Sequence, residues 1–236
     1  AWLKAHYPAA FMAAVLTADM DNTDKIDALV RECRSMGLEI EIPDVNNSRY
    51  EFSAAGDADI RYGLGAIKGV GKSAIMAVED ERRQGLYKDL DDLCRRVDLQ
   101  RVNRRAFEAL IKSGAADSLG INRASLLANL PDALRAAEQE AAAAEAGQTD
   151  LFGGGGGAET TAPQRRHRAR EEMSRKDRLS AEKQALGLYL TGHPIEAYRR
   201  ELKDLTGATI ADHLAGAPAG GNSSGGFSRG KPLSVA

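Results

Sequence analysis

The 236-residue sequence has few aromatic side chains, only two cysteines and no long hydrophobic run. A membrane-spanning helix needs about 20 consecutive apolar residues, and no stretch of the sequence approaches that length. Cys33 and Cys94 lie far apart, without a CxxC pair or a nearby histidine, which argues against a disulfide framework and against a zinc ribbon. We therefore expect two reduced, half-buried thiols in a cytoplasmic protein without membrane association.

An excess of one charge sign is also missing, because the formal net charge is only −2. Cations are nevertheless concentrated in two runs. Residues 95–112 contain six lysines or arginines against two acids, and residues 164–178 contain seven against three. Such runs are typical either of a solvated helix face or of a surface that binds a polyanion, and charge alone does not separate these interpretations.

Abundant alanine and helical spacing of apolar residues predict a mainly α-helical fold with one small β-hairpin. The hairpin is expected where Tyr50 and Phe52 alternate with polar residues, followed by a turn at Gly56-Asp57 and by the alternating segment 60–64. Helices are expected at residues 1–20 with a restart at Pro8, 24–36, 73–83, 90–97, 102–113, 122–146, 179–191 and 195–205.

The most informative segment is Ala66–Ser73, in which two glycines flank Val70. Glycines permit a tight turn that brings bare backbone amides to a phosphate, and the following helix adds its positive N-terminal end. Ile67 and Val70 would anchor the turn in the core, and lysines would supply charge beside it. This pattern predicts a helix-hairpin-helix turn that grips DNA phosphates without reading bases. The predicted DNA-binding residues are Lys68, Gly69, Val70, Gly71, Lys72, Arg104 and Arg105.

Three other interpretations of this segment compete. Gly71-Lys72-Ser73 matches the end of a nucleotide-binding P-loop, but Ala66 occupies its first glycine position and no buried strand precedes it. Residues 69–74 fit the GxGxxA dinucleotide pattern, without the βαβ context that it needs. A glycine turn that only joins two elements is the third. Because Gly63 and Gly65 are poor helix formers, the first helix of a hairpin must be very short or partly strand.

A second motif, Gln148-Thr149-Asp150-Leu151-Phe152, matches the QxxLF pattern of sliding-clamp-binding peptides. Its two large apolar side chains lie in a polar, glycine-rich setting, and each contributes about 1.5–3 kcal/mol on entering a pocket. The glutamine amide can fix the register of the peptide as donor and acceptor. Packing of the apolar pair against the preceding helix is the alternative. The predicted clamp-binding residues are Gln148, Asp150, Leu151 and Phe152.

Segments in collinear order resemble the bacterial replicative DNA polymerases of the C family. They are Leu3–Pro8, Asp21–Lys25, Pro43–Asn46, Arg61–Gly71, Leu110–Ala115, Gln148–Phe152 and Ala185–Pro194. The resemblance implies an internal fragment of a DNA-directed DNA polymerase, with the Mg²⁺-binding palm carboxylates located before residue 1. It also implies three partners: duplex DNA, the sliding clamp and other replicase subunits. The fragment itself is expected to hold no catalytic residue, no metal site and no cofactor.

The resemblance and the composition together divide the chain into five expected parts. Gly153–Gly157 and the basic run after it are typical of a flexible linker. The strand-like residues 231–236 resemble the beginning of an OB-fold, here truncated. The parts are distal fingers helices at 1–42, a helix-hairpin-helix and clamp-binding domain at 43–146, the clamp peptide and flexible linker at 147–178, a helical connection at 179–205, and a linker with the truncated OB-fold at 206–236.

Overall fold

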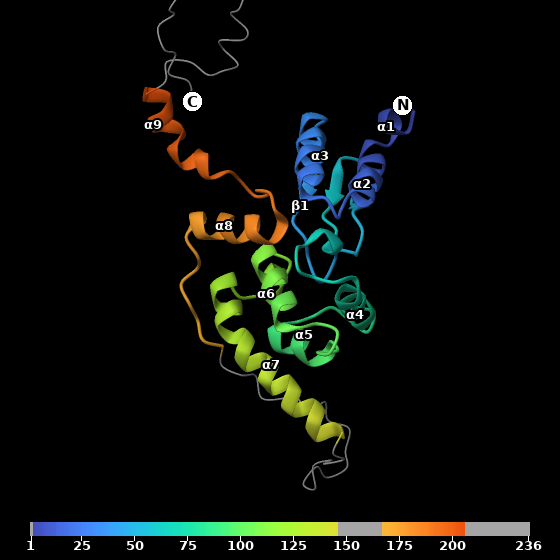
Figure 1. Cartoon of the computed structure of the whole chain (residues 1–236), viewed down its shortest axis with the longest axis vertical. Helices are drawn as coiled ribbons and strands as arrows, with labels where there is room; N and C mark the ends of the chain where they lie inside the picture. The colour runs from blue at the N-terminus through green and yellow to red at the C-terminus, as the bar shows by residue number, and fades with distance from the viewer. Residues whose placement is uncertain (1, 146–166, 206–236) are drawn as a thin grey trace, which may run out of the picture. The chain divides into compact units, whose positions relative to one another are not determined.

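The computed structural model describes residues 2–145 and 167–205. The chain divides into two compact units, Ala1–Thr191 and Gly192–Ala236. The described residues are mainly helical, as predicted, with one small sheet (Figure 1). No described helix is both long enough and apolar enough to cross a membrane.

The first unit begins with three predicted helices, α1 (Trp2–His6), α2 (Pro8–Ala18) and α3 (Thr23–Ser35). Pro8 takes the first position of α2, where its missing N–H is not needed for helix hydrogen bonding. The Asn22 side chain caps α3 by accepting a hydrogen bond from the Lys25 amide at 3.2 Å. Gly37, with φ of +78°, follows the end of α3 in the left-handed conformation that stops helices.

A small sheet follows, and it contains one strand more than the predicted hairpin. Its strands are β1 (Glu39–Glu41), β2 (Ser53–Ala54) and β3 (Asp59–Arg61), in the order β1-β3-β2. β2 pairs antiparallel with β3 around the predicted turn, whereas β1 runs parallel to β3 with Ile40 opposite Ile60. The sequence carries no signal for β1, because three residues are too few to show alternation. The rings of Phe52 and Tyr62 pack edge to face with centroids 4.7 Å apart, next to the short strands.

The remaining helices of the first unit share one apolar core. They are α4 (Lys72–Arg82), α5 (Leu90–Arg96), α6 (Arg104–Ser113), α7 (Arg123–Glu145) and α8 (Arg175–Leu186), with the 3₁₀ turns η1 (Leu64–Ala66) and η2 (Asp117–Leu119). α7 packs against α5 and α6, and α8 packs against α6 (Figure 1). Phe107, Leu110 and Ile111 form the predicted buried face of α6. Gly114, with φ of +92°, ends α6 as predicted.

The chain before α8 contains the end of the predicted flexible linker at 147–178, of which residues 147–166 lie outside the described residues. Residues 167–174, which we call the strap, form no helix or strand, yet α7 holds their backbone. The Asn129 side chain accepts from the Arg168 amide at 2.8 Å and donates to the Arg168 carbonyl at 3.0 Å. The Ser125 hydroxyl accepts from the Arg170 amide at 2.8 Å. The structure therefore differs from the linker prediction at two points: side chains of α7 bond the main chain of Arg168 and Arg170, and α8 begins at residue 175.

In the second unit, the single helix predicted for residues 195–205 is divided in two. A 3₁₀ turn, η3 (Pro194–Tyr198), precedes α9 (Arg199–Leu205). His193 caps this turn, since its Nδ1 accepts from the Ile195 amide at 3.3 Å and its own amide donates to Glu196 at 3.3 Å. The predicted OB-fold segment, within 206–236, lies outside the described residues.

Candidate nucleic-acid interface

The predicted hairpin lies between η1 and α4, and its turn consists of residues 67–71. η1 spans three residues, which confirms that the element before the turn is very short. Gly63 and Gly65 lie against the backbone of the preceding loop. A Cβ on Gly63 would be 2.7 Å from the Phe52 nitrogen, and one on Gly65 would be 2.8 Å from the Tyr50 carbonyl oxygen. Close backbone approach therefore explains why glycines occupy both positions.

Two apolar side chains anchor the turn, as predicted. Ile67 is 2% exposed and Val70 is 8% exposed, so both lie in the core. The Val70 amide donates to the Ile67 carbonyl at 3.3 Å, which closes the turn. The residues between and after these anchors are exposed. The inner side of the turn is thus packed into the core, and its outer edge faces solvent.

Along this outer edge lie backbone amides that have no acceptor in the part of the chain that the structure describes. The amides of Gly69, Gly71, Lys72 and Ser73 donate no hydrogen bond to any residue that the structure describes. The last three belong to the start of α4, whose first amides have no acceptor within the helix. Gly71 is the N-cap and has no side chain with which to accept from them. Such amides, together with the positive end of a helix, favour an anion such as phosphate.

The two glycines of the turn are there for different reasons. Gly69 has φ of +82°, a conformation that glycine adopts far more readily than other residues. Gly71 has φ of −75°, which any residue can adopt, and a Cβ there would meet no described atom within 4 Å. The fold itself therefore needs glycine at 69 but not at 71. A bare backbone at 71 suits a ligand that approaches closely.

The two predicted lysines have distinct environments. The Lys72 ammonium lies over the Tyr50 ring, 5.2 Å from its centroid. The Lys68 amide donates to the Ala185 carbonyl at 2.8 Å. The Lys68 ammonium lies beside Gly187, only 2.7 Å from the position that a Cβ on that glycine would take. The hairpin is therefore joined to the C-terminal end of α8, a contact for which the sequence carries no signal.

The predicted arginines lie at the start of α6. Arg104 forms an ion pair with Glu108 at 2.8 Å, one helical turn along. Arg105 is exposed and makes no ion pair with any described residue. Such a pair is typical of a solvated helix face, and Arg95 likewise pairs with Glu140 at 2.9 Å. Arg104 and Arg105 both stay predicted DNA contacts.

The nucleotide-binding interpretations do not fit this geometry. In a P-loop a buried strand runs directly into the glycine loop, and the surrounding sheet is parallel. Here β3 ends at Arg61 and η1 intervenes before Gly71. The described sheet is also mixed, with one parallel and one antiparallel pairing. The dinucleotide pattern fails for the same reason.

The cysteines do not form a reactive centre. Both are fully buried rather than half-buried as expected. Burial raises the pKa of the Cys33 thiol to about 11 and that of the Cys94 thiol to about 12. Both groups are therefore neutral thiols at physiological pH and poor nucleophiles. Within residues 2–145 and 167–205, no group of three His, Cys, Asp or Glu side chains could hold a metal ion.

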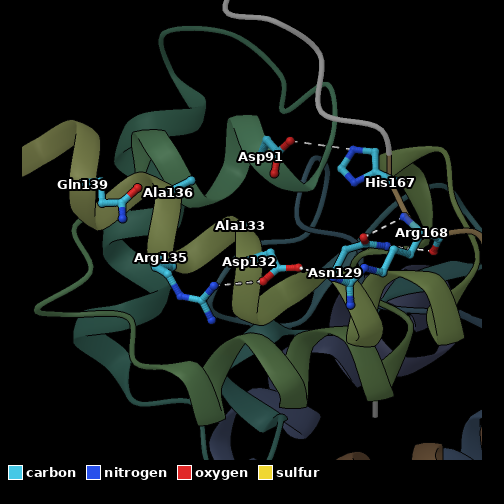
Figure 2. A pocket seen from close by; sticks show the side chains of 9 residues that line it. All are labelled: Asp91, Asn129, Asp132, Ala133, Arg135, Ala136, Gln139, His167 and Arg168. Carbon is cyan, nitrogen blue, oxygen red and sulfur yellow. Dashed lines mark hydrogen bonds and ion pairs between the residues drawn. The ribbon is translucent and has the colours of Figure 1, made fainter.

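A polar pocket of about 430 Å³ lies between α5, α7 and the strap (Figure 2). Its charged side chains are already paired with one another. Asp132 meets Arg135 at 3.3 Å and Arg168 at 3.6 Å, and Asp91 faces the His167 ring at 3.8 Å. No hairpin residue lines this pocket. These ion pairs join the start of the strap to α5 and α7. Because the charged groups of the pocket already have partners, the hairpin is the candidate site.

Comparison with known proteins supports that choice. A family model described as a helix-hairpin-helix motif matches residues 37–126, which include the whole hairpin. DNA polymerase III subunit alpha of Pseudomonas fluorescens is 47% identical over 227 residues, covering 90% of this chain and 19% of that protein. This chain is homologous to a segment of the DNA polymerase III alpha subunit. The alpha subunit of Escherichia coli K12 is 49% identical over 207 residues, covering 87% of this chain and 18% of its own length.

The resemblance to the C-family polymerases is thereby confirmed. The chain spans about a fifth of the length of the alpha subunits that it matches. The hairpin residues lie inside the described part of the chain, and all of them belong to one turn and the helix after it. The predicted clamp-binding residues Gln148, Asp150, Leu151 and Phe152 lie outside the described residues.

Proposed function

We propose that this chain is part of a replicative DNA polymerase and that it binds the sugar-phosphate backbone of duplex DNA through the hairpin at 67–73. The observation that carries this proposal is the row of exposed amides at Gly69 and at the start of α4, which have no acceptor among the described residues. Homology to DNA polymerase III alpha subunits and the helix-hairpin-helix match support it.

The proposed binding is independent of base sequence. Backbone amides and a helix N-terminus recognise phosphate oxygens, which are the same at every nucleotide. The hairpin contributes no exposed amide or carboxylate side chain of the kind that reads base edges. A polymerase that moves along its template needs this kind of contact, because the enzyme must hold each new position equally well.

The second proposed role is attachment to the sliding clamp through Gln148–Phe152. Sequence alone supports this role: an apolar pair follows a glutamine at the spacing of a clamp-binding peptide. A tether to a ring around DNA raises the effective concentration of the polymerase at its template without any new contact to DNA. Primer extension itself, with Mg²⁺ and palm carboxylates, is proposed for the longer protein, and this chain alone is expected not to extend primers.

A salt titration of duplex binding tests the proposed backbone contact. We expect the affinity of the chain for duplex DNA to fall steeply as salt rises, with a slope of log K against log salt near −0.9 for each phosphate contacted. Two duplexes of unrelated sequence should give the same curve, and ATP should not compete. Fluorescence anisotropy measures all three. ATP binding that disappears in the Lys72→Ala variant would instead favour the P-loop interpretation.

A further inference from the structure

Eleven of the lysines and arginines that the structure describes form an ion pair with a neighbouring acid. Ion pairs join Lys4 to Glu32 across two helices and Arg61 to Glu41 across two strands. Further pairs lie within single helices or join α5 to α7. They are Arg31 with Asp27, Arg83 with Asp80, Arg96 with Asp92, Arg104 with Glu108, Arg135 with Asp132, and Arg95 with Glu140. Other described cations have no described acid at ion-pair distance, and where several of them lie together the surface carries a net positive charge.

Three lysines gather around the last turn of α8 without any described acid within ion-pair distance. We call Lys68, Lys112 and Lys183 the lysine cluster. The Lys68 ammonium lies beside Gly187, and the Lys112 ammonium donates to the Gln184 side chain at 3.1 Å. The Lys183 ammonium lies over the Tyr189 ring, 4.6 Å from its centroid. Three different elements thus supply the cluster: the hairpin, α6 and α8.

Neutral groups contact two of these ammoniums and leave their charge unneutralised. An amide oxygen contacts Lys112 and an aromatic face contacts Lys183, and neither carries a formal charge. The nearest acid in sequence is Glu182, but it is fully buried and accepts hydrogen bonds from the amides of Leu190 and Thr191. The negative C-terminal end of the α8 dipole favours cations here. It carries only a partial charge, however, and does not neutralise three ammonium groups. Ammonium N–H donors therefore remain for a ligand of high negative charge.

The lysine cluster continues the outer edge of the hairpin. Lys68 directly precedes Gly69, and its own amide is bonded to Ala185 in the last turn of α8 at 2.8 Å. A chain of phosphates that meets the amides of Gly69 and Gly71 would thus reach Lys68 and the end of α8 next. Resting on the proposed function, we infer that the lysine cluster is a second contact for the sugar-phosphate backbone, beside the hairpin amides.

Removal of two of the charges tests this inference. The change is Lys112→Gln with Lys183→Gln in the full chain, and the probe is a fluorescent duplex. Lys183 is exposed and Lys112 is partly exposed, so thermal unfolding should change little. We expect the slope of log K against log salt to become shallower by about 2, and affinity at 0.1 M salt to fall on the order of tenfold to a hundredfold. Lys112→Arg with Lys183→Arg should retain the slope, because the charges are kept.

A matched pair of substitutions separates local from global charge. Lys4→Gln with Lys88→Gln removes the same formal charge from lysines outside the cluster, and its slope should equal that of the unmodified chain. If the Lys112/Lys183 variant also keeps that slope while the chain binds duplex, the lysine cluster does not meet the backbone and only this inference fails. If the unmodified chain shows no salt-dependent binding, both the inference and the proposed backbone contact are overturned.

Discussion

Replacement of Leu151 and Phe152 by alanine is expected to weaken severely the binding of this chain to the sliding clamp. Each side chain contributes about 1.5–3 kcal/mol when it is transferred from water into an apolar pocket. Loss of both therefore weakens binding by a factor on the order of a hundred to ten thousand, since each 1.4 kcal/mol is tenfold in affinity. Surface plasmon resonance with an immobilised clamp measures this loss.

The matched control for the clamp prediction is Thr149→Ala, in the same peptide. Thr149 occupies a position of the QxxLF pattern that is not fixed, so its truncation should leave clamp affinity within about twofold of the unmodified chain. The clamp affinity of Gln148→Ala is expected to lie between those of Thr149→Ala and Leu151→Ala/Phe152→Ala, because the glutamine contributes hydrogen bonds rather than apolar area. Clamp binding by the Leu151→Ala/Phe152→Ala variant at unmodified strength would remove the tether from the account.

Gly69→Val is expected to disrupt the hairpin and to weaken duplex binding by at least about tenfold. Gly69 has φ of +82°, and a β-branched residue is strongly disfavoured there. The left-handed conformation costs roughly 1–2 kcal/mol for a residue with a Cβ, so the turn should relax away from its present geometry. The outer amides of the hairpin would then no longer be positioned to bond the phosphate backbone, and two or more contacts between amides and phosphate oxygens would be lost together.

Gly37→Val provides the same backbone strain at a site away from the hairpin. Gly37 has φ of +78°, and no described atom lies within 4 Å of a Cβ added at Gly37 or Gly69. Both variants should therefore lose similar stability, about 2–8 °C in Tm by the size scaling of small domains. Only Gly69→Val should lose DNA affinity. Equal DNA affinity in the two variants would show that the turn geometry at 67–71 is irrelevant to binding.

The sequence was sufficient to locate the hairpin because the required residue types are local. Positive φ at Gly69 and close packing at Gly63 and Gly65 both demand glycine, and the buried anchors Ile67 and Val70 are apolar. Helix ends were also predictable where a single residue decides them, as Asn22 does for α3 and Gly114 for α6. Each of these features depends on neighbours within a few residues.

Features that depend on distant partners could not be predicted. The strap was expected to be flexible because its composition is basic, yet Asn129 and Ser125 hold its backbone from α7. The joining of Lys68 to the end of α8 spans more than a hundred residues of sequence. The same limit applies to charge, because the 95–112 run gives no indication that Arg95 pairs with Glu140 on α7 or that Lys112 contacts Gln184 on α8.

Gly71 offers the most direct test that the amides at the start of α4 meet a phosphate. Asp is a favoured N-cap residue, the φ of −75° accommodates it, and its Cβ would meet no described atom within 4 Å. Gly71→Asp should therefore fold with unchanged or slightly raised Tm, while its carboxylate occupies the amides and repels phosphate. We predict that duplex affinity at 0.1 M salt falls by at least about tenfold in Gly71→Asp, and by less in the uncharged Gly71→Asn. Duplex affinity equal to that of the unmodified chain in a normally folded Gly71→Asp variant would contradict the account.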